Sequence, residues 1–367
     1  MSRFTVFLTT AVLVAATASG EKQKSASDWA KMGPYGVGVR TVILVDSSRK
    51  DGYTEGGRTL VTDIWYPAPG KPKERSHTFT RFFGEHKDAA QRFVERVGSD
   101  LKEVERRFAC YAVRDARLLD GKFPLLVFSH GNGGVRHQNT FQLDHLASHG
   151  YVIATPDHTG NAAVTPLPGR ALPYDRKGRR ASGKDRPRDV SFLIDRLLEA
   201  KGDLAWLKGR LDGERIGALG HSFGGFTACR AAADDRRVKA ILPMTVAYGN
   251  ATDRPLLLML GKRDKTMGEA GNAAARLYYL SAKGPKHLFE FPNGGHFTFS
   301  DMGVIKPDFG DGIGKDFIAD SEAKKLIRAY GFAFFEHYLR GSKAAARLLA
   351  TKPDSAELEL KFEPAAK

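Results

Sequence analysis

The 367-residue sequence contains only two cysteines, Cys110 and Cys229. Two thiols exclude a scaffold held together by several disulfides, and the sequence leaves open whether these two pair with each other. The sequence also lacks an H-E-x-x-H motif and any cluster of cysteine and histidine at metal-ligand spacing. These absences exclude the common zinc motifs, so we expect chemistry that needs neither a metal nor a cofactor.

Long hydrophobic runs are absent after the first residues, where a membrane-spanning helix would need about 20 apolar residues. The apolar stretch Phe4–Ala15 is too short for this role, and it follows the positive charge of Arg3. Ala16-Thr-Ala18 has the small-x-small form that a signal peptidase cleaves. We therefore expect residues 1–20 to be a signal peptide and the protein to be secreted or periplasmic.

Internal repeats and linkers rich in proline or serine are also missing. Acidic residues number 42 against 57 basic ones, which gives a formal net charge of +15. Basic runs such as Arg176–Arg180 lack the motifs of nucleic-acid-binding folds, so we expect no nucleic-acid partner. The positive charge predicts weak attraction to anionic surfaces, and the sequence leaves the oligomeric state open.

Apolar runs that alternate with helical patterns make up most of the remaining sequence. Two β-rich runs, Val37–Val45 and Arg58–Tyr66, flank a turn-rich stretch and predict a hairpin. Further apolar runs predict buried strands, separated by helices, at 123–129, 151–155, 216–219, 238–244, 255–260 and 286–291. This alternation predicts an α/β fold with a doubly wound, mostly parallel sheet.

Two stretches interrupt this alternation. Residues 82–119 combine helical spacing with many charges, so we expect an inserted helical segment, about 71–120, over one end of the sheet. Ala162–Arg186 is polar and punctuated by prolines, and we expect an irregular excursion that leads to a helix around Asp189–Ala200. Residues 21–367 are expected to form a single domain in which these two insertions determine specificity.

The most informative stretch is Gly220-His-Ser-Phe-Gly-Gly225, a G-x-S-x-G sequence between an apolar run and a small-residue helix pattern. In this context the serine occupies a strained turn, and the glycines let the flanking backbone pass close to it. The following helix directs free N–H groups at a developing oxyanion. We interpret Ser222 as a nucleophile and the N–H of Phe223 as an oxyanion donor. The alternative is a glycine-rich turn without chemistry.

A serine hydroxyl becomes nucleophilic when a histidine accepts its proton and a carboxylate orients that histidine. In this architecture the acid and then the histidine follow the serine along the chain, on loops after strands. Asp264 directly follows the predicted strand 255–260, and His296 lies on a glycine-containing loop after the last predicted strand. We therefore predict a triad of Ser222, Asp264 and His296, with Asp301 as the next candidate for the acid.

A second oxyanion donor is expected on the glycine-rich loop Gly131-Asn-Gly-Gly134, which follows the first buried strand. By its position after His130-Gly131, the N–H of Asn132 is our choice. The expected walls of the substrate pocket follow from loop position alone: Phe223, Tyr248, Phe297 and the segment near His158.

Four motifs carry a resemblance to a known family: Thr62–Pro67, Phe123–Gly131, Ala147–His158 and Gly220–Gly225. They resemble the platelet-activating-factor acetylhydrolase-like α/β-hydrolases, which are related to dienelactone hydrolases and to bacterial cutinase-type polyesterases. The resemblance covers most of residues 35–300 and implies a metal-independent serine esterase for short or oxidised acyl esters. It implies nucleophile and base for Ser222 and His296, and oxyanion donors at Asn132 and Phe223.

The chain departs from the animal phospholipase members of that group at one place. Those members carry the acid after the strand that follows the nucleophile helix, where this chain has Pro243-Met-Thr245 and no carboxylate. Asp264, one strand later, matches the more general α/β-hydrolase arrangement.

From these observations we expect an exported serine carboxylic-ester hydrolase that acts through an acyl-enzyme. Its expected substrates are small-molecule or polymeric esters of the short-chain, lipid-like or polyester kind. Two alternatives remain: a peptidase or amidase on the same scaffold, and an exported binding protein without turnover. The intact order of serine, aspartate and histidine argues against the binding protein, because a protein without turnover would be free to lose one member.

Overall fold

The computed structural model describes residues 24–73 and 77–365. The expected signal peptide, residues 1–20, lies outside the described residues. Among the helices within the described ranges, none combines the length and the hydropathy that a bilayer crossing requires.

In the described part of the chain, ten strands form one sheet in the order β12-β11-β10-β9-β8-β4-β5-β2-β1-β3. Neighbouring strands from β11 to β5 run parallel, whereas β1–β2, β2–β5 and β11–β12 pair antiparallel. The bounds are β1 Gly36–Asp46, β2 Arg58–Ala68, β3 Ala112–Arg114, β4 Phe123–Ser129, β5 Val152–Asp157, β8 Leu211–His221, β9 Val238–Met244, β10 Leu256–Gly261, β11 Lys286–Phe291 and β12 Glu359–Glu363. The predicted hairpin and the mostly parallel α/β sheet are therefore confirmed.

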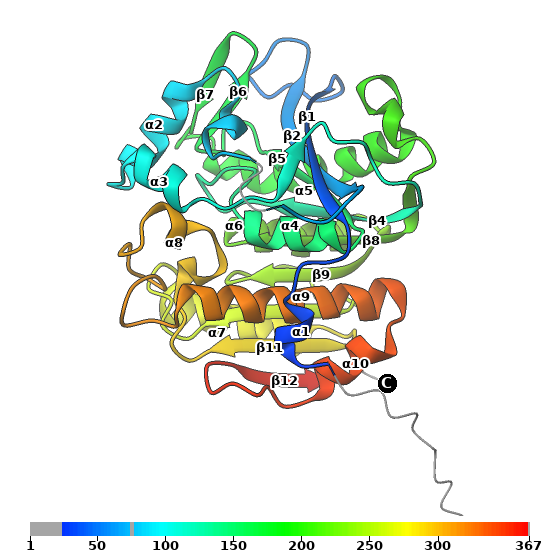
Figure 1. The fold of residues 1–367 in the computed structure, drawn as a ribbon, viewed down its shortest axis with the longest axis vertical. Coiled ribbons are helices and arrows are strands. Elements are labelled where there is room, and N and C mark those ends of the chain that lie inside the picture. The colour runs from blue at the N-terminus through cyan, green and yellow to red at the C-terminus, as the bar shows by residue number, and fades with distance from the viewer. Residues whose placement is uncertain (1–23, 74–76, 366–367) are drawn as a thin grey trace, which may run out of the picture.

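Helices cover both faces of the sheet (Figure 1). One face carries α1 Ala26–Trp29, α4 Thr140–Ser148, α9 Asp320–Arg340 and α10 Lys343–Ala350. The other carries α5 Arg179–Glu199, α6 Phe223–Asp234 and α7 Gly268–Ser281, with the short η2 Gly202–Leu207. This is the two-sided cover that a parallel sheet requires.

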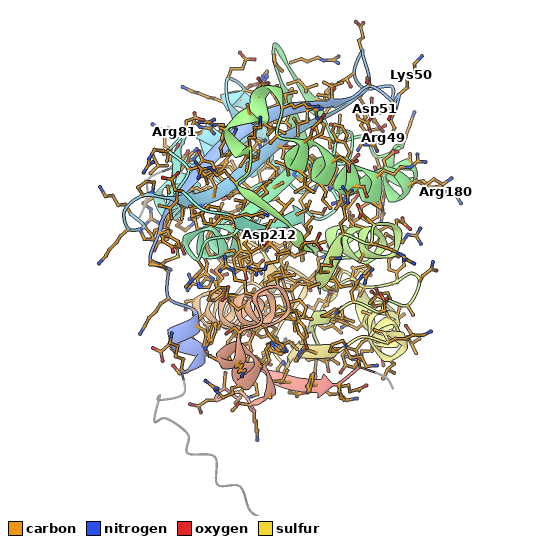
Figure 2. All side chains as sticks on the ribbon, turned by 90° about the vertical axis from the view of Figure 1, so that its right-hand side faces the viewer. Arg49, Lys50, Asp51, Arg81, Arg180 and Asp212 are labelled. Atoms are coloured by element: carbon orange, nitrogen blue, oxygen red, sulfur yellow. The ribbon has the colours of Figure 1, made fainter. Side chains whose placement is uncertain are left out.

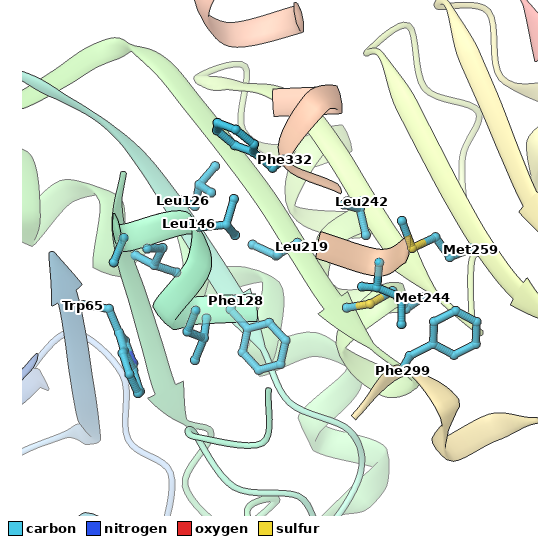
Figure 3. Close-up of a cluster of buried hydrophobic side chains, with 14 of the residues drawn as sticks. Trp65, Leu126, Phe128, Leu146, Leu219, Leu242, Met244, Met259, Phe299 and Phe332 are labelled. Atoms are coloured by element: carbon cyan, nitrogen blue, oxygen red, sulfur yellow. The ribbon is translucent and has the colours of Figure 1, made fainter. Parts of the chain in front are cut away.

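The strand β4 shows how a continuous apolar run builds both layers. Successive side chains of a strand point to opposite faces. Leu126 and Phe128 therefore join the cluster beneath α9, where Phe332 also lies, while Leu125 and Val127 join the cluster beneath α5 and α6 (Figure 3). Because both faces are buried, every residue of β4 is buried, as predicted for a central parallel strand.

Helices from two separate parts of the chain lie along one side of the molecule, at the left in Figure 1. They are α2 Lys87–Arg96, α3 Leu101–Arg107 and α8 Met302–Ile305, with the 3-10 turns η1 Thr80–Phe83 and η3 His296–Phe299 nearby in sequence. The interval expected as a helical insertion thus holds η1, α2 and α3. The helical spacing predicted as far as residue 119 is wrong beyond α3, because Ala112–Arg114 forms β3 and pairs with β1.

The second insertion differs from the prediction. Within Ala162–Arg186 the hairpin β6 Val164–Leu167 and β7 Arg170–Pro173 forms, and α5 begins at Arg179 instead of near Asp189. Pro187 lies inside α5, where proline costs a backbone hydrogen bond without ending the helix. The prediction assigned the polar residues before Pro187 to an irregular excursion and so missed the first turns of the helix.

The two cysteines are both free and buried. Cys110 lies in the cluster beneath α4 and α9, and Cys229 lies on α6 in the cluster on the opposite face. The sequence left open whether these two cysteines form a disulfide, and in the structure they do not.

Candidate active site

Ser222 lies between β8 and α6 with a positive φ of 56° and ψ of −121°. Non-glycine residues rarely adopt such a conformation, which costs about 1–3 kcal/mol and persists only where the surroundings impose it. The surroundings here are backbone. A methyl group at Gly224 would lie 1.8 Å from the Ser129 carbonyl oxygen, and one at Gly220 would lie 2.4 Å from the carbonyl oxygen of Gly224. The two glycines are therefore required by the close packing of the turn against β4.

The three predicted triad residues lie together. His296 Nε2 is 2.9 Å from the hydroxyl oxygen of Ser222, and His296 Nδ1 is 2.8 Å from Asp264 Oδ2. With a proton on Nδ1, His296 donates to the carboxylate and accepts from the serine hydroxyl, as a general base must. The Asp264 side chain is fully buried, and its second oxygen accepts from the Met267 N–H at 2.8 Å.

A further carboxylate joins the loops that carry Asp264 and His296. Asp311 accepts from the backbone N–H of His296 at 3.1 Å and from those of Lys265 and Thr266 at 2.8 and 2.9 Å. Burial alone would raise the pKa of Asp311, but the hydrogen bonds from Thr266 and the backbone hold it below its usual value. The sequence pattern did not indicate this role of Asp311.

Both predicted oxyanion donors lie beside the serine. A methyl group at Gly131 would be 3.4 Å from Ser222 Cβ, so the loop that carries Asn132 packs against the nucleophile. The N–H of Asn132 has no partner among the described residues. Phe223 is the first residue of α6, so no carbonyl lies one turn before it in the helix. Both residues line the same cavity as Ser222.

A chain of hydrogen bonds connects the oxyanion loop to the histidine loop. The side-chain oxygen of Gln138 accepts from the Gly131 N–H at 3.0 Å. The side-chain nitrogen of Gln138 lies 2.9 Å from His221 Nδ1. His221 Nε2 lies 2.8 Å from the His296 carbonyl oxygen, which can only accept. Burial and the neighbouring His296 lower the pKa of His221 to about 3, so the ring is neutral and links the two loops. The sequence pattern did not indicate this role of His221, which occupies the first variable position of the G-x-S-x-G sequence.

The triad opens into a cavity of about 550 Å³. Its apolar wall comes from the insertion at about 71–120 and from α8, and includes Phe79, Phe93, Val97, Phe108, Met302 and Ile305. The predicted wall residues Phe223, Tyr248 and Phe297 do line it. His158 does not, so that prediction is wrong.

His158 is instead part of a second Ser–His–Asp arrangement. Its Nε2 lies 3.0 Å from the Ser129 hydroxyl oxygen and its Nδ1 lies 2.8 Å from Asp189 Oδ2. Burial and the nearby Arg186 lower the pKa of His158 to about 3. All three side chains are buried and none lines the cavity, so no substrate can reach this serine as the structure stands.

Comparison with known proteins places this site in a family. The sequence model of the alpha/beta hydrolase fold matches residues 124–246. The model described as "Platelet-activating factor acetylhydrolase, isoform II" matches residues 31–170 and 190–344, which is most of the chain. The chain belongs to this family. The resemblance carried by the four sequence motifs is thereby confirmed.

Several curated relatives bear the family's name, and two of them illustrate the extent of the match. Platelet-activating factor acetylhydrolase from Cavia porcellus is 27% identical over 146 residues, which is 32% of this chain and 34% of the relative. The protein of the same name from Canis lupus familiaris is 26% identical over 181 residues, which is 39% of this chain and 40% of the relative. The chain therefore aligns with less than half of the length of each.

A solved structure is similar over nearly the whole chain. The ferulic acid esterase from Streptomyces cinnamoneus superimposes with a TM-score of 0.70 at 29% sequence identity. The match covers 89% of this chain and 96% of the esterase, so the α/β-hydrolase fold is shared throughout.

Proposed function

We propose that the protein is a serine carboxylic-ester hydrolase. The observation that carries this proposal is the unbroken hydrogen-bond chain from Ser222 through His296 to Asp264, which opens into a largely apolar cavity. Two candidate oxyanion donors lie beside the serine, so each group that acyl transfer needs has a residue in place.

The proposed mechanism passes through an acyl-enzyme. His296 takes the proton of Ser222 as the hydroxyl attacks the ester carbonyl, and the N–H groups of Asn132 and Phe223 stabilise the oxyanion. Asp264 holds the histidine tautomer and stabilises the imidazolium. Collapse of the tetrahedral intermediate releases the alcohol, which takes the proton from His296. Water activated by His296 then releases the acid and restores the serine. No step uses a metal.

The cavity favours esters that carry an apolar group, and we propose that this is a short or aromatic acyl group. Its apolar wall consists largely of phenylalanine and aliphatic side chains, which bind apolar groups by excluding water. The names of the relatives support a short or aromatic acyl group, since one set is called acetylhydrolase and the solved neighbour is called a ferulic acid esterase. We also propose that the protein is exported, because of the sequence of its first 20 residues.

A panel of substrates tests the proposal. The purified protein is assayed on p-nitrophenyl acetate, butyrate and octanoate, on methyl ferulate, on a short-acyl phospholipid and on a peptide p-nitroanilide, with and without EDTA. We expect turnover of the short or aromatic esters, unchanged by EDTA. Preferential cleavage of the anilide would make the protein an amidase, and no turnover of any substrate would favour the binding protein.

A further inference from the structure

Arg186 is a fully buried arginine directly behind the proposed oxyanion hole. It lies on α5, six residues after Arg180, which projects outward from the same helix (Figure 2). Its exposed fraction is 0%, although arginine is almost never fully buried unless it is paired.

The guanidinium contacts both segments that carry the oxyanion donors. Nη2 donates to the carbonyl oxygen of His130, two residues before Asn132. Nη1 donates to Asn161 Oδ1 at 2.9 Å, and Asn161 donates in turn to Asn132 Oδ1 at 2.9 Å. The guanidinium carbon also lies 4.7 Å from the centre of the Phe223 ring. One side chain thus connects the Asn132 loop with the first residue of α6.

Stability alone does not account for this arginine. Within the described residues, no carboxylate oxygen lies within 4.0 Å of its nitrogens, and its Nε–H has no partner. The charge of Asp189 acts on Arg186, but this carboxylate already receives two hydrogen bonds from Arg58, at 2.5 and 2.7 Å. Burial lowers the pKa of Arg186 to about 9, which leaves it charged at neutral pH. A buried cation without an ion pair lowers stability, so a benefit elsewhere has to explain it.

We propose that Arg186 is a positioning residue that holds the Asn132 and Phe223 donors at the spacing an oxyanion requires. Its positive charge, in a site of low dielectric, also favours negative charge that develops nearby. The inference rests on the proposed ester hydrolysis and deepens it. It predicts that Arg186 acts on the transition state and has little effect on binding of the ground-state ester.

Arg186→Met tests this, because methionine fills much of the volume without charge or donors. Deleting an oxyanion donor costs roughly 10²- to 10³-fold in kcat, and for a residue that only positions donors we expect about 10- to 100-fold. KM for p-nitrophenyl butyrate should change by less than about three-fold. A trifluoromethyl ketone forms a tetrahedral adduct with the serine. Its inhibition constant should rise by the same factor by which kcat/KM falls. Arg186→Lys, which keeps the charge, should recover part of the loss.

Arg340→Gln is the matched control. Arg340 donates to the carbonyl oxygens of His149 and Gly150 and lies 4.2 Å from the Tyr151 ring, at the other end of β5. Its loss should lower Tm and leave kcat and the ketone affinity unchanged. If Arg186→Met does not fold, Asn161→Ala breaks the link to Asn132 alone and should lower kcat several-fold.

Two outcomes separate the inference from the function on which it rests. If Ser222→Ala retains turnover, the proposed function fails. If Ser222→Ala is inactive but the folded Arg186 variants, or Asn161→Ala in their place, keep kcat and ketone affinity within two-fold of wild type, the positioning role is overturned.

Discussion

At the scale of single residues, burial and hydrogen-bond partners decide which carboxylate can orient His296. Asp264 is buried and lies at 2.8 Å from His296 Nδ1, whereas the Asp253 side chain is 74% exposed and precedes β10. Asp301 is also buried, but its Oδ2 accepts from the Thr140 N–H at 2.6 Å, at the start of α4. Asp301 therefore holds the start of α4, whereas Asp264 is the carboxylate in contact with the His296 ring.

We predict that Asp264→Asn lowers kcat by about 10⁴, because an amide favours the wrong histidine tautomer and cannot stabilise the imidazolium. Steady-state kinetics with p-nitrophenyl butyrate measures the effect. Asp253→Asn is the surface control and should stay within two-fold of wild type. Asp301→Asn should lower Tm with little change in kcat. A kcat for Asp264→Asn within a few-fold of wild type would place the acid elsewhere.

Among the elements, the turn from β8 to α6 depends on backbone that passes close to β4. The sequence was sufficient to predict this turn, because glycines, an apolar strand and a small-residue helix are all local signals. It was not sufficient for β12, at the far edge of the sheet, or for the start of α5, where the polar residues before Pro187 suggested an irregular excursion. Those elements are formed by packing against partners that are distant in sequence.

We predict that Gly224→Ala destabilises the protein by about 3 kcal/mol or more, since the new methyl group would meet the Ser129 carbonyl and force backbone to move. Chemical denaturation measures the free energy of unfolding. Gly213 lies on β8, the strand that leads into the turn, and a methyl group there would contact only Leu198 at 3.6 Å, so Gly213→Ala should change stability by less than about 1 kcal/mol. Equal effects of the two substitutions would contradict the close-packing account.

At the scale of the whole molecule, the arrangement of Ser222, Asp264 and His296 was predictable. In this architecture the three residues recur in that chain order, with the acid and the histidine on loops that follow strands. The groups that support this arrangement were not predictable. Arg186 and His130 lie 56 residues apart, and Gln138 and His221 lie 83 apart, with no motif to connect them. Such polar contacts follow from tertiary packing, which one sequence without its fold does not reveal.

The export proposal concerns the chain as a whole. We predict that the protein recovered from the medium or the periplasm begins near Ser19 or Glu21, because Ala16-Thr-Ala18 is the expected cleavage motif. Intact-mass measurement of the exported protein gives the result directly. Recovery of the protein with Arg3 still present, or only from the cytoplasm, would refute the prediction.

The central claim is that Ser222 is the nucleophile. Ser129, which belongs to the second and buried Ser–His–Asp arrangement, is the serine with which it can be compared. The most direct measurement is mass spectrometry of the protein after reaction with a fluorophosphonate, followed by peptide mapping. We predict one adduct per chain, on Ser222, with complete loss of esterase turnover, and neither labelling nor turnover in Ser222→Ala. An adduct on Ser129 or another residue, or turnover retained by Ser222→Ala, would contradict the account.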